Sequence, residues 1–400
     1  MTLRIAIIGG GIGGLAAALF LRRAGLDATV YEQAAALHPV GAGIVVAPNM
    51  VRLFEKLGLS HPARPAAGFV CLEAAWEFRR WGDGRVLSVQ PMGEACERLY
   101  GAACYVAHRA DVMGALHQAL PADPLRLDHR LVALAQDGRE VALSFARRDG
   151  RQHQVTADLA IGADGIHSVV RQAIAADTGA RFSGLCAFRC LVPADDAPGL
   201  ARRPVQTLWL GPGRHLVHYP ISGGRLINVV AFVPAGSWRT ESWTADGDVA
   251  DLRAEFAAWD APLRQLLARA PSTKRWAIFD REPLDAWTAG RISLLGDAAH
   301  AMLPFFAQGA AQAVEDAAVL AGCLATATPA SVPEALQRYE QIRRPRARQV
   351  QLMSRGREVQ NHLDDGPAQQ ARDAALASGE PLRQSAWLYG HDAEADLARS

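Results

Sequence analysis

The stretch RIAIIGGGIGGLAAALFLRRAGLDATVYE, residues 4–32, decides the fold of this chain. Its apolar, β-branched start, Arg4–Ile8, predicts a strand that is buried on both faces, and the glycines that follow predict a tight turn. Residues 13–24 are rich in alanine and leucine, which predicts a helix that ends at Gly25. A second strand at Asp27–Tyr31 closes a βαβ unit, which is usually one half of a parallel, doubly wound sheet.

The glycine spacing in this unit indicates a dinucleotide site. Gly9, Gly11 and Gly14 form a GxGxxG pattern between the first strand and the helix, where backbone N–H groups can approach a pyrophosphate. Glu32 lies 18 residues after Gly14, at the end of the second strand, where a carboxylate accepts hydrogen bonds from ribose hydroxyls. The acid argues against a 2′-phosphate, but these residues alone leave NAD and FAD both open.

Composition excludes several classes of protein. Half of the residues are apolar and 21% are charged, which rules out a wholly disordered chain. The 42 basic and 41 acidic residues nearly cancel, so we expect neither a nucleic acid nor a membrane as partner. The six cysteines show no zinc-type spacing, so we expect no metal, and Cys186 and Cys190 fit two buried strand positions. Five glycines interrupt the apolar run at residues 5–21, which argues against an export signal and favours a cytoplasmic protein.

The rest of the chain alternates between two kinds of pattern. Hairpin signals at Gly82–Gly84, Asp137–Gly138 and Asp149–Gly150, with short strand-like runs at 182–233, indicate antiparallel sheets. The buried-strand pattern returns at 291–295 and is followed by a helix-like segment, and a helix from Glu334 should bend or stop near Pro345. We therefore expect a nucleotide-binding domain interrupted by a β-rich one. The expected segments are the nucleotide-binding residues 1–68, 100–178 and 275–330, a hairpin of the second domain at 69–99, the β-rich domain at 179–274, and C-terminal helices and tail at 331–400.

Two later motifs bring the chain close to a known family. Gly162-Ala163-Asp164-Gly165 leads to Ser168 and Arg171, and Gly296-Asp297-Ala298-Ala299-His300 is followed by Pro304 and Gly309. With the first glycine motif, this order resembles the class A flavoprotein monooxygenases, the single-component aromatic hydroxylases. The resemblance covers essentially the whole chain, including Trp387–Gly390. It implies an α/β fold in which a Rossmann-like FAD-binding domain, with a mixed and mainly parallel sheet, is interrupted by a β-rich substrate domain and followed by C-terminal helices.

The same resemblance implies a set of cofactor residues for non-covalent FAD. Asp297 would accept hydrogen bonds from the ribitol, and Asp164-Gly165 would touch the pyrophosphate and the nicotinamide donor. Gly309 and Ala310 open a helix whose free N–H groups can stabilise negative charge on the reduced ring. The expected cofactor residues are Gly9, Gly11, Gly14, Glu32, Arg109, Leu131, Asp164, Gly165, Asp297, Gly309 and Ala310.

His215 and Tyr219 are the candidate catalytic pair. They stand four residues apart on a predicted strand, so they point to the same face, and either could take the proton of a phenol. The resemblance supports this interpretation, because a His-x-x-x-Tyr pair lines the substrate pocket of relatives that act on hydroxybenzoates and 6-hydroxynicotinate. A purely structural hydrogen-bonded pair stays the alternative, and His218 on the opposite face is expected to be structural.

The expected pocket lining favours a benzene ring. The 6-hydroxynicotinate 3-monooxygenases carry histidines at positions that match Val45 and Phe305, and a cysteine at the position that matches Gln206. The apolar lining that we expect from Val45, Pro304 and Phe305 fits the rings of salicylate hydroxylase and 3-hydroxybenzoate 6-hydroxylase substrates better. Arg189 would meet a substrate carboxylate or brace the two domains.

We expect an NAD(P)H- and O2-dependent monooxygenase that hydroxylates a phenolic aromatic carboxylate through a flavin C4a-hydroperoxide. NAD(P)H would bind transiently, and the protein would be a monomer or a homodimer. The alternatives are a 6-hydroxynicotinate-type hydroxylase of N-heteroaromatic rings, and a non-oxygenating flavin reductase on the same fold. Three further classes have less support. The Trp-x-Trp signature of flavin halogenases is missing, and the intact His/Tyr pair argues against a flavin-binding sensor without turnover. An NAD-dependent dehydrogenase would have no use for the Asp297 motif.

Overall fold

The computed structural model describes residues 3–36, 43–59, 70–71, 75–121, 124–176, 178–242 and 244–399. A six-stranded sheet of order β19-β20-β12-β1-β2-β8 lies at the centre of the nucleotide-binding part. All neighbours in it pair in parallel except β19 with β20, which confirms the mainly parallel sheet. Its strands are β1 (Ile5–Ile8), β2 (Ala28–Tyr31), β8 (Leu125–Arg126), β12 (Leu159–Gly162), β19 (Thr288–Ala289) and β20 (Ile292–Leu294).

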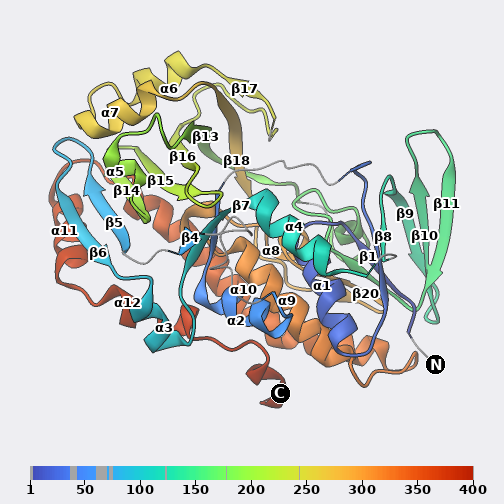
Figure 1. Ribbon diagram of the computed structural model, residues 1–400. Helices are drawn as coiled ribbons and strands as arrows, with labels where there is room; N and C mark the ends of the chain where they lie inside the picture. The colour runs from blue at the N-terminus through green and yellow to red at the C-terminus, as the bar shows by residue number, and fades with distance from the viewer. Residues whose placement is uncertain are drawn as a thin grey trace.

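Burial explains why the central strands are apolar throughout. Every residue of β1 and β12 is buried, as expected for parallel strands that are covered on both faces. Helix α1 (Ile12–Arg23) packs against α9 (Gly309–Leu324), which in turn packs against α10 (Val332–Asn361) (Figure 1). A single hydrophobic cluster joins the sheet to these helices. The first and the last motif of the sequence therefore meet in one core.

The second large sheet has eight strands, in the order β17-β18-β13-β16-β15-β14-β5-β6. Its neighbours are antiparallel, except that β14 and β5 run parallel. The hairpin predicted around Gly82–Gly84 supplies its last two strands. The strands are β5 (Ala75–Arg80), β6 (Val86–Gln90), β13 (Arg181–Pro193), β14 (Val205–Gly211), β15 (Arg214–Ile221), β16 (Leu226–Pro234), β17 (Asp246–Gly247) and β18 (Thr273–Asp280).

The two faces of this sheet have different roles. One face carries Cys186, Cys190 and Leu216 and packs under α6 (Val249–Glu255) and α7 (Ala261–Ala268), which Figure 1 shows covering the sheet. Both cysteines are buried and reduced at strand positions, as predicted. The opposite face turns toward the nucleotide-binding part. Because side chains alternate along a strand, the second face is the one that receives His215 and Tyr219.

Smaller elements complete the fold. One three-stranded sheet is β9 (Arg130–Gln136), β10 (Val141–Ala146) and β11 (Gln152–Ala157), and the other is β3 (Gly43–Val46), β7 (Tyr105–His108) and β4 (Val70–Cys71). The remaining helices and turns are α2 (Pro48–Lys56), α3 (Glu94–Tyr100), α4 (Arg109–Ala119), η2 (Val170–Ala173), α5 (Gly199–Arg202), α8 (Asp297–His300), η3 (Pro304–Phe306), α11 (Pro367–Ser378), α12 (Pro381–Gln384), α13 (Ala386–Tyr389) and η4 (Ala395–Ala398).

The expected stop near Pro345 is wrong. Helix α10 runs from Val332 to Asn361 through this proline. A proline inside a helix costs about 3 kcal/mol, and buried ion pairs on both sides offset that cost. Arg343 contacts Glu315 and Asp316 at 2.8 Å, and Arg346 contacts Glu315 at 2.8 Å. At Pro345, tertiary contacts therefore outweigh the low helix propensity of proline.

The sequence order of the strands supports the expected domain layout. Strands of the six-stranded sheet lie at residues 5–31, 125–162 and 288–294, and those of the eight-stranded sheet at 75–90 and 181–280. We therefore keep the six segments as the proposed domain division, with one correction: β18 (Thr273–Asp280) continues the eight-stranded sheet past the expected boundary at residue 274. No helix among the described residues is long and apolar enough to span a membrane.

Candidate active site

The glycine turn between β1 and α1 is shaped by close packing on one side and by open space on the other. A Cβ atom on Gly9, which has φ +110°, would lie 2.3 Å from the Ala163 carbonyl oxygen, and one on Gly14 would lie 2.0 Å from the Gly9 oxygen. A Cβ on Gly11 would meet no atom within 4 Å. Two glycines thus allow strand, turn and helix to pack, and the third keeps a cradle open at the N-terminus of α1. This geometry fits a pyrophosphate, since the first N–H groups of a helix have no intrahelical partner.

Glu32 stands beside the cradle at the end of β2. Its Oε2 atom accepts a hydrogen bond of 2.7 Å from the Gly10 N–H, and its Oε1 atom accepts one of 2.8 Å from the Ala34 N–H. These bonds fix the carboxylate while lone pairs stay available on both oxygens. The predicted hydrogen bonds to ribose hydroxyls are compatible with this geometry.

The Asp164 carboxylate is engaged by its own turn. It accepts hydrogen bonds from the Ser168 hydroxyl and from the N–H groups of Val169 and Val170. Arg171 then donates to the carbonyls of Ile166 and Ala298 at 2.8 and 3.1 Å, which joins this turn to α8. The mid-chain motif therefore builds a hydrogen-bonded loop after β12, and Asp164 and Gly165 of this loop line the cavity.

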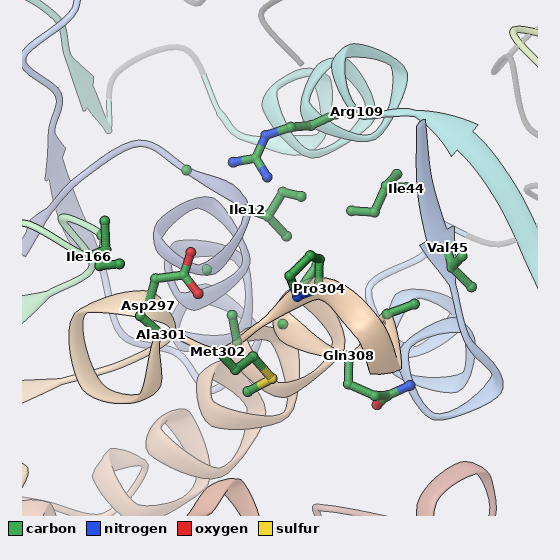
Figure 2. A pocket seen from close by; sticks show the side chains of 18 of the residues that line it. Ile12, Ile44, Val45, Arg109, Ile166, Asp297, Ala301, Met302, Pro304 and Gln308 are labelled. Atoms are coloured by element: carbon green, nitrogen blue, oxygen red, sulfur yellow. The ribbon is translucent and has the colours of Figure 1, made fainter. Parts of the chain in front are cut away.

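Asp297 and Arg109 come to the cavity from opposite sides. Asp297 is the first residue of α8, after Gly296 with φ +60°, and Arg109 is the first residue of α4. Figure 2 shows both side chains pointing toward the same space, near Ile12 and Met302. Burial lowers the pKa of Arg109, and Asp297 acts against that shift. Leu131, on β9, also lines the cavity.

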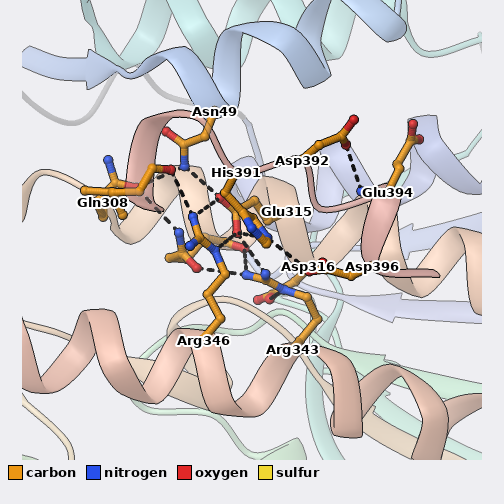
Figure 3. Close-up of polar contacts among 12 residues, drawn as sticks. Asn49, Gln308, Glu315, Asp316, Arg343, Arg346, His391, Asp392, Glu394 and Asp396 are labelled. Atoms are coloured by element: carbon orange, nitrogen blue, oxygen red, sulfur yellow. Dashed lines mark hydrogen bonds and ion pairs between the residues drawn. The ribbon is translucent and has the colours of Figure 1, made fainter. Parts of the chain in front are cut away.

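A buried network of charges holds α8 in place (Figure 3). Asp316 accepts hydrogen bonds from the Gly296 N–H at 2.9 Å and from His300 Nε2 at 2.6 Å, so it binds the residues on both sides of Asp297. Arg343 donates to Asp316 and to Glu315 at 2.8 Å. Burial alone would raise the pKa of Glu315, but Arg343 and Arg346 lower it to about 2. The network is thus ionised at neutral pH.

The same network reaches the N-terminus of α9. Asn49 donates to Glu315 Oε1 at 2.7 Å and to the Gln308 side-chain oxygen at 3.1 Å. Gln308 precedes Gly309 and Ala310, and its buried Nε2 atom has no hydrogen-bond partner. The helix N-terminus and this amide together form a donor set that suits a negatively charged ring edge.

The substrate-facing side of the cavity is the open face of the eight-stranded sheet. Strand pairing places His215 opposite Phe232 and Tyr219 opposite Asn228. His215, Val217 and Tyr219 all line the cavity, whereas His218 is buried outside it, as predicted. The lining residues that these strands contribute are Trp76, Phe78, Gln90, Arg189, Gln206, Leu208, His215, Val217, Tyr219, Val230, Phe232, Trp276, Ala277, Ile278 and Phe279.

His215 has a partner that the sequence analysis did not identify. Its Nδ1 atom lies 2.6 Å from Nε2 of His362, which follows α10. Its ring also stacks on Phe232 and meets Phe305 edge-on. Burial and the neighbouring His362 lower the pKa of His215 well below its usual range, and burial lowers that of His362 to about 4. Both imidazoles are therefore neutral at pH 7, so one ring nitrogen of the pair is a donor and the other an acceptor.

Tyr219 and Arg189 form a second polar region of the cavity wall, apart from His215 and His362. A Cβ on Gly43 would lie 2.6 Å from the Tyr219 hydroxyl oxygen, so β3 approaches this phenol closely. Burial raises the pKa of Tyr219, and Arg189 acts against that shift. Arg189 lies over the Trp276 ring, 3.7 Å from its centroid, and burial lowers the pKa of its guanidinium to about 9.

One cavity of about 1270 Å³ joins these two ends. Its lining includes every residue of the predicted cofactor and substrate sets except Gly14, which packs behind the turn. The volume exceeds the roughly 300–1,000 Å³ of a typical small-molecule pocket, so a dinucleotide and an aromatic ring fit side by side. Val45, Pro304 and Phe305 all lie in its wall (Val45 and Pro304 are labelled in Figure 2). Among the described residues, no group of histidine, cysteine and acidic side chains could hold a metal ion.

This fold and cavity define a flavoprotein of the FAD-binding Rossmann type. The family model that is described as "FAD binding domain" matches residues 2–354. The chain is 42% identical over 390 residues to a 3-amino-4-hydroxybenzoate 2-monooxygenase of Streptomyces platensis, which covers 98% of this chain and 96% of the relative. It is 35% identical to a 6-hydroxynicotinate 3-monooxygenase of Bordetella bronchiseptica, over 88% of this chain and 90% of the relative.

A solved structure has the same architecture. A substrate complex of salicylate hydroxylase superimposes with a TM-score of 0.83 at 28% identity, over 99% of this chain and 97% of the other. The chain belongs to the FAD-binding domain family, and it is an FAD-dependent aromatic monooxygenase. The predicted class, fold and cofactor are confirmed.

Several residues of this site carry only a weak signal in the sequence. Glu315 and Asp316 are two adjacent acids inside an otherwise apolar, alanine-rich helix, which is the pattern that could have revealed a buried network. His362, Arg357 and Asn361 lie in a polar stretch whose contacts depend on where α10 ends. Nothing in their local pattern separates them from surface residues.

Proposed function

We propose that this monooxygenase hydroxylates a phenolic aromatic carboxylate of the hydroxybenzoate type, and that amino-substituted hydroxybenzoates are the first substrates to test. The observation that carries the proposal is the position of His215 and Tyr219 on one face of β15, in a cavity wall that is otherwise largely apolar. The 3-amino-4-hydroxybenzoate 2-monooxygenases among the relatives support the amino group, which the sequence analysis did not anticipate.

The cofactor end of the cavity fits FAD on this chain's own geometry. We propose that the cradle at Gly9–Gly14 takes the pyrophosphate, Glu32 a ribose, and Asp297 the ribitol. The N-terminus of α9, at Gly309 and Ala310, would stabilise negative charge on the reduced ring, because its N–H groups point to that end of the cavity. When bound, FAD would take a hydride from NAD(P)H and supply an activated oxygen atom from O2.

The protein's contribution to the chemistry is the removal of a proton. A ring carbon ortho or para to a hydroxyl or amino group becomes more nucleophilic as the O–H or N–H proton leaves. His215 is neutral and can accept that proton, and Tyr219 can donate or accept a hydrogen bond at the same substrate edge. Phe232 and Phe305 enclose His215 and exclude water, which favours transfer of oxygen to the ring over its loss.

The 6-hydroxynicotinate alternative has less support in this cavity. Val45 and Phe305 stand where that reaction's relatives carry histidines, according to the family resemblance. Hydrophobic side chains offer no partner to the ring nitrogen and carbonyl of a pyridone, whose desolvation is costly without hydrogen bonds. A cytoplasmic location and a monomeric or homodimeric state stay predictions.

A substrate screen tests the proposed function. Holoenzyme is incubated with NADH or NADPH and with 3-amino-4-hydroxybenzoate, 3-hydroxybenzoate, salicylate or 6-hydroxynicotinate. The expected result is faster NAD(P)H oxidation with a benzoate and a product that gains one oxygen atom from ¹⁸O₂. Stimulation of NAD(P)H oxidation without an oxygenated product from any ring would instead support the flavin reductase.

A further inference from the structure

The last turns of α10 deliver three side chains into the cavity. Met353, Arg357 and Asn361 recur every four residues, so they share one face of the helix. The end of this face lies beside β15, because His362, which follows Asn361, contacts His215, and α10 also packs against η3, which carries Phe305 and Phe306. The C-terminal part of the chain thus forms one wall of the substrate end.

Arg357 differs from its neighbours in having no counter-ion. Arg343, Arg344, Arg346, Arg348 and Arg355 of the same helix each have a carboxylate within 4.0 Å. No carboxylate of the described residues acts on Arg357, whose guanidinium instead lies over the Phe306 ring, 5.4 Å from its centroid. Burial lowers the pKa of Arg357, Tyr389 acts against that shift, and the Arg372 cation adds to it. A half-buried cation of this kind gains stability when an anion joins it.

Asn361 supplies an independent observation. Its side chain is only 2% exposed, and its Nδ2 atom has no hydrogen-bond partner. A buried amide donor without a partner costs about 1–3 kcal/mol. This donor lies one helical turn after Arg357 and lines the same cavity, so both side chains can donate N–H groups to a ligand at this end.

The neighbours of this pair indicate which ligand suits it. His362, the next residue, bonds to His215, and Phe305 contacts both of these imidazoles. Arg357 and Asn361 are therefore connected to the His215–His362 pair through Phe305 and Phe306, which both line the cavity. We propose that Arg357 and Asn361 form the carboxylate subsite of the aromatic substrate, an inference that rests on the proposed function.

Arg189 is the competing anchor for the carboxylate. It is half-buried on β13, and the charges of Tyr219 and of the cofactor-side cation Arg109 act on it. It therefore sits toward the cofactor end, and its guanidinium already stacks on Trp276. We assign it to the polar region at Tyr219, and the experiment includes it as a rival.

Benzoate and benzamide test the carboxylate subsite by binding alone. Neither ligand carries a phenolic hydroxyl or a ring amino group, so we expect no hydroxylation. Only benzoate is charged, so a difference between the two reports on recognition of the carboxylate. FAD-loaded protein is titrated with each, and binding is followed by flavin absorbance and by calorimetry. Arg357→Met is expected to weaken benzoate about ten- to a hundred-fold, the scale for a lost charged hydrogen bond, and to leave benzamide unchanged. Asn361→Leu should weaken benzoate several-fold, and Arg357→Lys should restore part of the affinity.

Arg348→Met is the matched control, since that arginine is on the same helix, 54% exposed and outside the cavity lining. If Arg357→Met loses FAD, Arg357→Gln takes its place. The proposal is wrong if the wild type does not prefer benzoate, if Arg357→Met or Arg357→Gln keeps the preference, or if the preference follows Arg189→Met instead. Benzoate binding through Arg357 without hydroxylation of any phenolic acid contradicts the proposed function alone. Hydroxylation with an unchanged KM in Arg357→Met contradicts the subsite alone.

Discussion

At the scale of single residues, the site combines three titratable groups that burial keeps neutral at pH 7. Burial keeps His215 and His362 unprotonated and keeps the Tyr219 phenol protonated. In each case the charged form would have to leave water without a full set of partners. The unprotonated His215 imidazole therefore keeps a lone pair that can accept a hydrogen bond from the substrate at pH 7.

Tyr219→Phe separates proton removal from packing, because it keeps the ring and removes the hydroxyl. FAD content and fold should not change, while oxygen transfer slows by roughly 10²–10⁴-fold, the range for positioned proton transfer. NAD(P)H oxidation should then exceed hydroxylated product, with the difference recovered as hydrogen peroxide. The measurement is the ratio of product to NAD(P)H consumed. Tight coupling at an unchanged rate would assign Tyr219 to packing.

His362 is expected to position His215. His362→Phe removes the hydrogen-bond partner of His215 Nδ1. Loss of this buried hydrogen bond should slow oxygen transfer roughly tenfold, which is the scale of one such bond. His362→Gln keeps a hydrogen-bonding group and should restore most of the rate. The readouts are the coupling ratio and kcat, with KM expected to change little. Equal behaviour of the two variants would remove His362 from the mechanism.

Asp297→Ala tests the assignment of Asp297 to the ribitol. Loss of a charged hydrogen bond should raise the Kd for FAD about ten- to a hundred-fold. The affinity is measured by titrating FAD into protein from which the flavin has been removed. An unchanged Kd would restrict Asp297 to the N-terminus of α8.

At the scale of elements, buried charges add to the apolar packing of three helices. Helices α8, α9 and α10 meet through Glu315, Asp316 and Arg343, each of which is completely buried. A network of this kind specifies one arrangement of the helices, because a shift of any of them leaves a buried charge without a partner.

Asp316→Asn should destabilise the fold and the cofactor site together. Removing one member of a buried ion pair typically costs about 3–5 kcal/mol, and α8 would lose its hold on Asp297. We expect a lower urea midpoint and a weaker FAD affinity. Asp285→Asn is the control, since Asp285 is 98% exposed and its pair with Arg348 spans 3.8 Å, so its change should stay within about 0.5 kcal/mol. Equal effects of the two variants would contradict this account.

At the scale of the whole molecule, the same network links stability to pH. Its partners lower the pKa of Glu315 from 4.5 to about 2. A carboxyl with a lowered pKa contributes its stability fully above the pKa of the unfolded chain and loses it as pH falls through the folded one. The contribution of Glu315 should thus be complete above about pH 4.5 and decline toward pH 2.

Comparison of the wild type with Glu315→Gln measures this contribution. The difference in free energy of unfolding should be constant from pH 7 to about 5 and should shrink by about 3 kcal/mol toward pH 2, following the pKa difference. Urea unfolding of the holoenzyme at a series of pH values provides the data. A difference that stays the same down to pH 2 would show that Glu315 is not ionised in the folded protein.

The sequence by itself determined the nucleotide-binding half of this protein. Gly9, Gly11, Gly14 and Glu32 are close together in the chain, and their spacing encodes a local βαβ geometry that few other structures satisfy. His215 and Tyr219 were also predictable as a pair, because the period of two along a strand places them on one face. These inferences needed only short-range rules.

Only the tertiary structure decided what surrounds them. Helix α10 continues through Pro345 because Arg343 and Arg346 find buried carboxylates on α9, and that continuation carries Arg357, Asn361 and His362 to the substrate end of the cavity. His215 and His362 are 147 residues apart in the chain and 2.6 Å apart in space. Such contacts depend on the packing of whole helices against a sheet, which no local pattern of residues specifies.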